Sequence, residues 1–138
     1  MDGENIDYLE YARTIIGRDP LAAFLGITVE EVRENYALCS IVVKPHLMNI
    51  LGRAHGSLIY ALSDQALAVA SNSAGNSAMT VNFNINYIAG ASEGEKICSE
   101  ARPVKVGKAI SVWKIEVTGP GKNLIASGEA IAYHKNKG

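Results

Sequence analysis

The sequence predicts an α+β fold in which an antiparallel β-sheet wraps around one long central helix, preceded by a short N-terminal helix. Residues 57–70 are rich in Ala and Leu, contain neither Gly nor Pro, and are apolar around most of a helical circumference, which is typical of a buried helix. Several other segments alternate apolar and polar residues with a period of two, and short turns join them. The 138 residues are slightly fewer than the ~150 of an average domain, so we expect one domain over residues 1–138.

The N-terminal third is expected to hold one helix and two strands. Apolar residues recur every three or four positions over residues 5–17, and Pro20 follows as a stop signal, so we expect a short amphipathic helix there. Strand-like runs come next, at residues 27–32 and 36–43. Residues 44–56 contain Pro and Gly and are expected to form an irregular loop before the central helix.

The C-terminal half is expected to complete the sheet. A turn at residues 72–76 ends the central helix, and four strand candidates follow it. These candidates cover residues 78–87, 95–104, 109–118 and 124–133. Because one helix covers only part of such a sheet, we expect two chains to associate edge to edge, which removes an exposed strand edge.

Charged residues are almost absent from the stretch around the central helix. A composition of 48% hydrophobic and 20% charged residues is globular, and a net charge of −1 gives no general attraction to nucleic acid or to an anionic membrane. A uniform spread would place about 8 charges in the 39 residues from Ala54 to Ser92, yet Asp64 is the one charged residue there. Scattered Asn, Ser and Gly residues interrupt this stretch, so we expect no membrane span.

Cellular location and thiol chemistry are inferred from a few residues. Residues 1–4 are acidic where a secretory signal peptide would be basic, so we expect a cytoplasmic protein. Cys39 and Cys98 are 59 positions apart, lie in alternating apolar segments and lack a C-x-x-C spacing. We therefore expect two buried free thiols rather than a disulfide or a metal site, and we expect no cofactor.

Gly56 and Asp64 are the residues whose chemistry stands out. The first turn of a helix has unsatisfied N–H groups and partial positive charge, so Gly56 can donate to the oxyanion of a reacting carbonyl. Alternatively, Gly56 only starts the helix and Ser57 caps it. Asp64 lies on an apolar helix, where loss of water raises the pKa of a carboxyl group to values that suit a general base. Alternatively, Asp64 bonds nearby hydroxyls or marks a hydrated face.

A straight helix keeps these two residues apart. Asp64 follows Gly56 by eight positions, which corresponds to ~12 Å along the helix axis and ~80° around it. The two residues of one chain therefore cannot touch one small reacting group. If they cooperate, Asp64 must meet Gly56 of a second chain, and two antiparallel central helices related by a two-fold axis would give two such sites.

Other candidate residues lie in the loop before the helix and on a later turn. His55 is either a ligand contact or a helix cap, and Asn49 is either a ligand contact or a loop former. Arg102, Lys105 and Lys108 surround a turn and either bind phosphates at the mouth of a site or belong to a solvated loop.

Thr80 begins a row of polar residues on one predicted strand. A period of two places Thr80 on the face opposite Phe83, so we expect the row to face solvent or an interface, with Thr80 as the exception. The other members of the row are Asn82, Asn84 and Asn86.

Three segments read Asn49-x-x-Gly52-x-x-His55-Gly56, Leu62-Ser63-Asp64-Gln65-Ala66 and Ser71-Asn72-Ser73-x-Gly75. Together they resemble the signature of the hotdog-fold acyl-CoA thioesterases, and most closely the phenylacetic acid degradation (PaaI-like) subfamily. Two positions depart from the family pattern: Ser57 replaces the usual second glycine, and a threonine or serine at the position of Thr80 is shared unevenly among relatives. Val69 stands where dehydratases of the same fold would need a histidine.

The resemblance implies a hotdog fold with a thioesterase site shared across a dimer interface. Asn49, His55 and Gly56 would come from one subunit, and Asp64 and Thr80 from its neighbour. Asp64 would act as general base or nucleophile, the Gly56 N–H would polarise the thioester carbonyl, and Asn49 would help to place the water or the carboxyl group. This chemistry needs no metal.

We therefore expect a cytoplasmic acyl-CoA thioesterase that converts an acyl- or arylacetyl-CoA to the free acid and CoA. A homodimer, or a dimer of dimers, is expected, with Arg102, Lys105 and Lys108 holding the CoA phosphates. Two alternatives are a non-catalytic acyl-CoA-binding module and a lyase or hydratase of the same fold. Transcription regulators of this fold carry a DNA-binding segment, and the residues before Leu21 are too few and not basic enough to form one.

Overall fold

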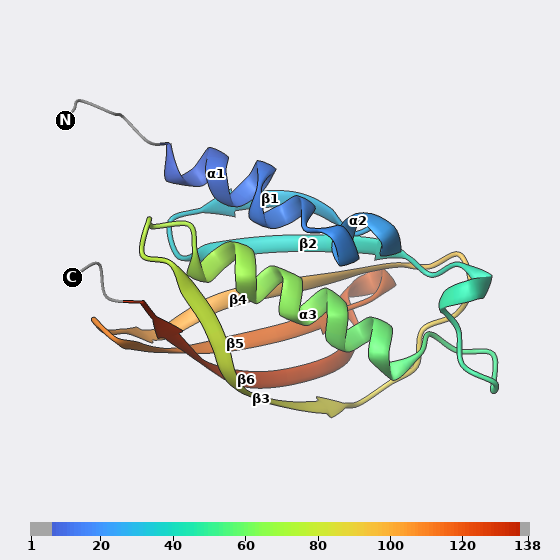
Figure 1. Ribbon diagram of the computed structural model, residues 1–138. Helices are drawn as coiled ribbons and strands as arrows, with labels where there is room; N and C mark the ends of the chain where they lie inside the picture. Colours follow the sequence, from blue (N-terminus) through green and yellow to red (C-terminus); the bar gives the residue numbers. More distant parts are fainter. Residues whose placement is uncertain (1–6, 136–138) are drawn as a thin grey trace.

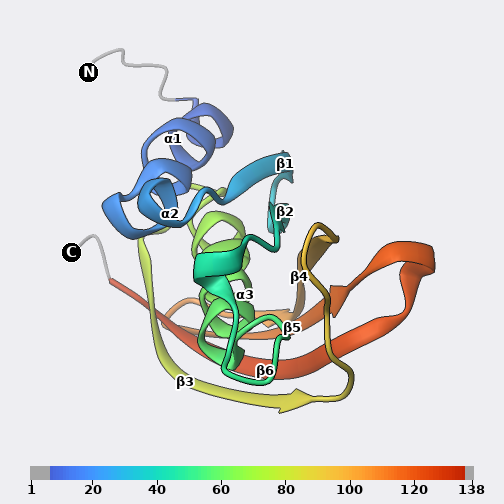
Figure 2. The same cartoon turned by 90° about the vertical axis from the view of Figure 1, so that its right-hand side faces the viewer.

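In the computed structural model, which describes residues 7–135, an antiparallel β-sheet curls around the long helix α3 (Gly56–Ser71) (Figure 1, Figure 2). The described part of the chain forms six strands in the order β1-β2-β4-β5-β6-β3, and all neighbours are antiparallel. The strands are β1 (Thr28–Arg33), β2 (Tyr36–Val42), β3 (Ala78–Tyr87), β4 (Lys96–Val106), β5 (Ile110–Thr118) and β6 (Leu124–His134). The fold class predicted from the sequence is confirmed.

Helix α3 supplies the centre of the core. Leu62 and Leu67 are fully buried in one cluster with Trp113 of β5. Full burial of a leucine side chain contributes about 1.5–3 kcal/mol, so these contacts fix the helix against the sheet. The helix is not buried on all sides, however, because residues at a spacing of three and four form a partly exposed stripe. This open face of α3 consists of Ser57, Tyr60, Ala61 and Asp64.

The N-terminal segment folds into two short helices where the sequence predicts one. Helix α1 (Tyr8–Thr14) is followed by a 3-10 turn (Ile16–Arg18) and then by helix α2 (Pro20–Leu25). The predicted first positions of the N-terminal helix, residues 5 and 6, lie outside the described residues. Both short helices lie beside α3 and β1 in Figure 2.

Helix α2 begins at the proline that the prediction treated as a stop signal. Pro20 occupies the first turn, where its missing N–H has no helical partner to lose and its fixed φ suits the helix. Asp19 caps the helix, since its side chain accepts a hydrogen bond from the N–H of Ala22 at 3.0 Å. Gly26 ends the helix with a φ of 89°, a left-handed conformation that favours glycine.

A β-bulge changes the predicted facing of residues on β3. The pairing of β3 with β6 shifts between Thr80 and Asn82, so Val81 is an extra residue without a partner. Thr80 therefore lies on the same face as Phe83, toward α3, while Asn82 is exposed. The prediction that Thr80 shares a face with the three asparagines is wrong, because strict alternation stops at the bulge. Strand β3 forms one edge of the described sheet.

Both cysteines are free thiols, as predicted. Cys39 is buried as expected, but Cys98 is only half-buried, so the expectation of two buried thiols is wrong for Cys98. Their strands are neighbours, but Cys39 pairs with Ser99 and Cys98 pairs with Ser40, so the two thiols point to opposite faces of the sheet. Burial raises the pKa of Cys39 to about 12, which keeps this thiol protonated and unreactive at neutral pH.

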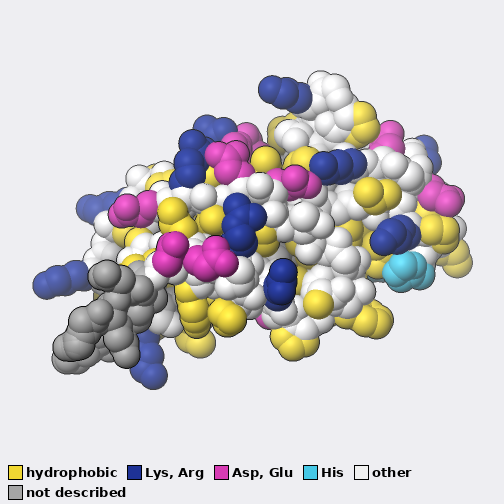
Figure 3. All heavy atoms as spheres, turned by 90° about the horizontal axis from the view of Figure 1, so that it is seen from above, with side chains coloured by type: hydrophobic (Ala, Val, Ile, Leu, Met, Phe, Trp, Pro, Cys, Tyr) yellow, Lys and Arg dark blue, Asp and Glu magenta, His cyan; other side chains and the backbone are white. Residues whose placement is uncertain are grey.

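The surface carries charges of both signs. Acidic and basic side chains are interspersed over the face seen in Figure 3, in keeping with the net charge of −1. Within residues 7–135, no helix combines the length and hydropathy needed to cross a membrane.

Candidate active site

The loop before α3 is built around the side chain of Asn49. The Asn49 Oδ1 atom accepts hydrogen bonds from the N–H of Leu51 at 2.9 Å and from the N–H of Arg53 at 3.0 Å. Gly52 completes this turn with a φ of 80°, which is a conformation that favours glycine. Of the two interpretations of Asn49, these contacts support the loop former.

His55 is the residue that caps α3. Its Nδ1 atom accepts a hydrogen bond from the N–H of Ser57 at 3.0 Å. The alternative in which Ser57 caps the helix is therefore wrong, and the capping interpretation of His55 is supported. This cap leaves Gly56 as the first residue of the helix, where its N–H has no intrahelical partner.

Gly56 lies against an aromatic ring of β3. The hydroxyl of Tyr87 donates a hydrogen bond to the Gly56 carbonyl at 3.2 Å. A Cβ atom placed on Gly56 would lie 3.5 Å from the Tyr87 ring, which is an ordinary van der Waals contact. The packing of this chain therefore does not itself demand a glycine at this position.

Asp64 lies two turns further along the open face of α3, where its side chain is half-buried. The Thr80 hydroxyl is within hydrogen-bond distance, 3.5 Å from Asp64 Oδ1, so the bulge of β3 brings these two predicted residues together. Burial raises the pKa of Asp64, the Thr80 hydrogen bond opposes this change, and the negative charge of Asp19 adds to it. This upward change in the pKa of Asp64 agrees with the expectation for a carboxylate on an apolar helix.

Two adjoining cavities run along this face of α3, with volumes of about 580 and about 380 Å³. Both are lined by Leu21, Ser57 and Ala61, so they are neighbours, and we call the two cavities together the α2–α3 groove. Asp64 lines one end of the groove, and Met48 lines the other. A ligand in the groove therefore reaches the carboxylate directly.

The structure does not bring Gly56 and Asp64 of one chain together. Both belong to one helix, Gly56–Ser71, so the separation of ~12 Å expected from eight helical residues applies. Thr80 accompanies Asp64, whereas Asn49 and His55 accompany Gly56. The predicted residues thus form two groups, one around the start of α3 and the other around Asp64, two turns further along the helix.

The three predicted phosphate ligands lie at the opposite end of the sheet from Gly56 of the same chain. Arg102 and Lys105 belong to the second half of β4, and Lys108 lies in the turn that leads to β5. Lys108 lines a cavity with Gly75, which lies just beyond the C-terminal end of α3. Within one chain, these cations do not meet the group around Gly56.

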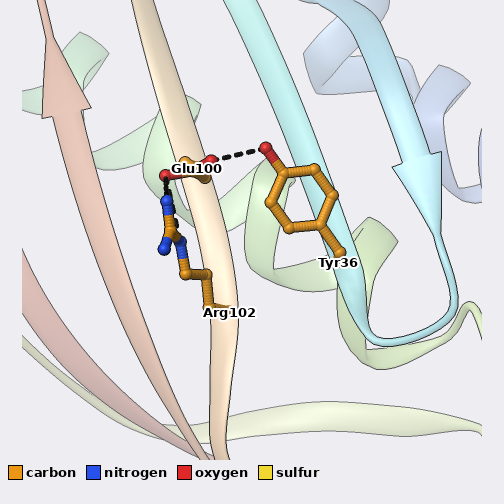
Figure 4. Close-up of polar contacts among 3 residues, drawn as sticks. All are labelled: Tyr36, Glu100 and Arg102. Atoms are coloured by element: carbon orange, nitrogen blue, oxygen red, sulfur yellow. Dashed lines mark hydrogen bonds and ion pairs between the residues drawn. The ribbon is translucent and has the colours of Figure 1, made fainter.

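Arg102 is engaged in a polar cluster on the outer face of the sheet (Figure 4). Glu100 forms an ion pair with Arg102 at 2.5 Å and accepts a hydrogen bond from the Tyr36 hydroxyl at 2.5 Å. Partial burial by itself would raise the pKa of Glu100, but the hydrogen bonds from Tyr36 and Arg102 outweigh it and the pKa is lowered. Burial and the neighbouring carboxylate raise the pKa of Tyr36 to about 12.

Sequence reasoning missed three residues that line the groove beside Asp64. Tyr60 precedes Asp64 by four positions, so helical periodicity alone could have placed it on the same face. Asp19 is the N-cap of α2 and Leu21 belongs to this helix, and nothing in the local sequence indicates that they lie beside α3. Among residues 7–135, no three His, Cys, Asp or Glu side chains form a group able to hold a metal ion.

Comparisons with known proteins show which family the chain belongs to. Residues 51–126 match the thioesterase superfamily. A putative esterase of Archaeoglobus fulgidus is 35% identical over 86% of this chain and 77% of its own. The acyl-coenzyme A thioesterase PaaI of Escherichia coli is 26% identical over 83% of this chain and 82% of its own.

Solved structures show the same fold. The structure of the E. coli PaaI protein superposes with a TM-score of 0.89 at 23% identity over 94% of both chains. A Streptococcus mutans protein bound to acetyl CoA has a TM-score of 0.77 at 25% identity, covering 80% of this chain and 90% of its own. A sheet wrapped around α3 in this way is the hotdog fold of PaaI-like proteins, and the enzyme is a thioester hydrolase. The chain belongs to the thioesterase superfamily.

Proposed function

We propose that this protein hydrolyses the thioester of an acyl- or arylacetyl-coenzyme A to a free carboxylic acid and coenzyme A. The observation that carries the proposal is Asp64, half-buried in the α2–α3 groove with Thr80 beside it. Two relatives support the substrate class, since PaaI of E. coli is an acyl-coenzyme A thioesterase and the S. mutans protein holds acetyl CoA.

Asp64 acts either as a base or as a nucleophile. As a base, its carboxylate takes a proton from water while the water oxygen adds to the thioester carbon. The tetrahedral intermediate then collapses, the C–S bond breaks, and the proton passes to the CoA thiolate. As a nucleophile, the carboxylate adds to the thioester carbon, the C–S bond breaks, and CoA leaves as a thiolate, so that a mixed anhydride of Asp64 and the acyl group remains. Water then cleaves the anhydride to the free acid and the Asp64 carboxylate, and the proton released passes to the CoA thiolate. Thr80 orients the carboxylate in both routes, and the raised pKa makes Asp64 a stronger base.

The Gly56 N–H stabilises the negative charge that develops on the carbonyl oxygen. An N–H at a helix start carries partial positive charge and is fixed before the reaction begins. The absence of a side chain at Gly56 has no explanation in the packing of this chain, and it lets a ligand approach the backbone closely. His55 fixes the start of the helix, and Asn49 holds the loop that precedes it and helps to place the water.

The complete site requires two chains. Because ~12 Å separates Gly56 from Asp64 in one chain, Asp64 and Thr80 act with Asn49, His55 and Gly56 of a partner in an isologous dimer. Strand β3 at the sheet edge is the pairing surface, and dimers associate further into a dimer of dimers. Antiparallel α3 helices would bring the end that carries the three cations toward the partner's Gly56. This arrangement supports a phosphate-binding role for Arg102, Lys105 and Lys108.

Release of free thiol from a panel of acyl-CoAs tests the proposal. We expect Asp64→Asn to lower kcat by about 10²- to 10⁴-fold, the usual contribution of a general base. Glu129→Gln is the matched control, because it makes the same chemical change at an exposed residue of β6. If Asp64→Asn keeps kcat within a few fold of the parent, Asp64 is neither base nor nucleophile. Tight acyl-CoA binding by calorimetry without any thiol release would instead identify a binding module.

A further inference from the structure

Strand β3 carries a row of three asparagines that the proposed reaction does not use. Asn82, Asn84 and Asn86 are exposed and alternate with Phe83 and Ile85, which pack against the core. The row therefore lies on the face of the sheet that points away from α3. Asparagine is disfavoured in strands, so three at alternate positions call for an explanation. Asn84 Nδ2 donates a hydrogen bond to Asn82 Oδ1 at 2.9 Å, so neighbouring amides of the row can bond to one another.

The charges on the two edge strands favour β3 as the edge that pairs with a second copy of the chain. Strands β1 and β3 form the two edges of the described sheet (Figure 2). Strand β1 contains Glu30, Glu31 and Arg33, and charged side chains hinder the addition of another strand. Strand β3 contains no charged residue and no proline over its 10 residues. Its edge is therefore open to pairing.

The two-chain site determines where a two-fold axis passes each element. In that site Asp64 meets the partner's Gly56, so the axis passes midway between positions 56 and 64 of α3, beside Tyr60. On β3, Thr80 lies beside Asp64 and Tyr87 lies beside Gly56. Thr80 therefore faces the partner's Tyr87.

Counting along β3 from this pair places Asn84 on the axis. Val81 is the extra residue of the bulge and is left out of the count. The successive pairs, each joining one chain to its partner, are Thr80–Tyr87, Asn82–Asn86, Phe83–Ile85 and Asn84–Asn84. Every pair joins side chains on the same face of the sheet, as antiparallel pairing requires. The Tyr60 ring lies 5.1 Å from the Phe83 ring, so the midpoints on α3 and β3 are neighbours and one axis fits both.

We infer that β3 pairs with the partner's β3 about a two-fold axis at Asn84, and that the asparagine row sets this register. The inference rests on the two-chain site of the proposed function. A contact on the axis needs a group that bonds to its own copy, and an amide does so because it has both a donor and an acceptor. A slip by one residue would set amides opposite apolar side chains. A slip by two would move Thr80 by ~7 Å along the partner strand, away from the partner's Gly56.

Single cysteines in the row test the register. Directly opposite residues of antiparallel strands have Cα atoms about 4.5–5.5 Å apart, within the range that a disulfide spans. Under mild oxidation, Asn84→Cys should therefore run as a covalent dimer on a non-reducing denaturing gel. Asn82→Cys and Asn86→Cys are the matched controls, because two copies of either residue lie ~13 Å apart along the strands. Both controls should run as monomers, and so should the parent, which keeps Cys39 and Cys98.

The double variant Asn82→Cys/Asn86→Cys tests the same register away from the axis. Its two cysteines face each other across the dimer, so it should cross-link although neither single variant does. This variant keeps the test valid if the geometry at Asn84 is unfavourable for a disulfide.

Charge at the axis gives a second readout. Asn84→Asp places two carboxylates opposite each other and should raise the dissociation constant of the dimer about fivefold. Asn82→Asp is the matched control, because it faces the neutral Asn86 and should have a clearly smaller effect. Sedimentation over a range of protein concentrations at pH 7 measures both constants. Equal effects of the two variants would overturn the placement of Asn84 on the axis.

The gel and an activity assay together separate this inference from the proposed function. A cross-link in Asn82→Cys or Asn86→Cys alone would place the axis elsewhere and overturn the inference. The lack of a cross-link in both Asn84→Cys and the double variant would overturn it as well. If the parent still releases thiol from acyl-CoAs in those cases, the inference alone fails. If the parent hydrolyses no acyl-CoA, the proposed function fails, whatever the gel shows.

Discussion

Replacing Gly56 by proline removes one hydrogen-bond donor with little other change to the helix. Proline is well tolerated at the first helical position, which Gly56 occupies. The residue before a proline must be extended, and His55 already has a φ of −67° and a ψ of 141°. A Cβ at this position makes an ordinary contact of 3.5 Å with Tyr87. The variant therefore isolates the contribution of the N–H group.

The expected loss follows from the role of an oxyanion donor. Removal of one such donor lowers kcat by about 10²- to 10³-fold, or about 2.7–4 kcal/mol of transition-state stabilisation. Gly56→Ala is the control, because it adds the same Cβ and keeps the N–H. Steady-state thiol release should show the large loss in kcat for Gly56→Pro and a clearly smaller loss for Gly56→Ala. Equal kcat values for the two variants would refute the role of the N–H.

Mixing two inactive variants tests whether the site is shared. Random association of equal amounts of Gly56→Pro and Asp64→Asn chains gives about half heterodimers. Each heterodimer has one site with both defects and one intact site, so the mixture should recover about one quarter of the parent activity. If Gly56 and Asp64 of the same chain worked together, every site would carry a defect and no activity would return.

Two further predictions concern the charge on Asp64. Asp19→Asn should keep the cap of α2, since Asn caps as well as Asp. The variant loses a negative charge that raises the pKa of Asp64, so the acidic limb of the kcat–pH profile should move to lower pH. An acidic limb at the same pH as that of the parent would contradict this coupling. Asp64→Asn should raise the free energy of unfolding at pH 7 in urea titrations. The folded pKa of Asp64 is raised above the unfolded value, so stability falls as pH rises through these two values and stays lower above them. An Asn variant no more stable than the parent at pH 7 would show that burial of this charge costs no stability.

Most of the fold could be predicted because periodicity reports burial directly. The central helix, predicted at residues 57–70, is observed at Gly56–Ser71, since Ala and Leu without Gly or Pro favour a helix in any surroundings. Helix α2 was missed because Pro20 has two opposite meanings, as a helix end and as a first helical residue. The Asp19 cap that distinguishes them is visible in the sequence as an Asp-Pro pair.

The chemistry of the candidate site was more accessible to sequence analysis than its shape. Asp64 stood out because a charge on an apolar helix is costly wherever the helix packs. The groove depends on the placement of α2, with Leu21, beside Ala61 of α3, and no local sequence pattern records how two separate elements are placed. The position of the cations was likewise set by strand order, which places the β4–β5 turn at the far end from Gly56.

The extra residue at Val81 divides β3 into two segments with independent phases. The segment before it turns Thr80 toward the carboxylate, and the segment after it turns Phe83 into the core. If Val81 were instead paired with β6 in unbroken alternation, Thr80 would point outward while Phe83 kept its place. The strand would then preserve its packing and lose the hydroxyl beside Asp64. The bulge at Val81 thus keeps the hydroxyl of Thr80 and the ring of Phe83 on the same face of β3, although three positions separate them in the sequence.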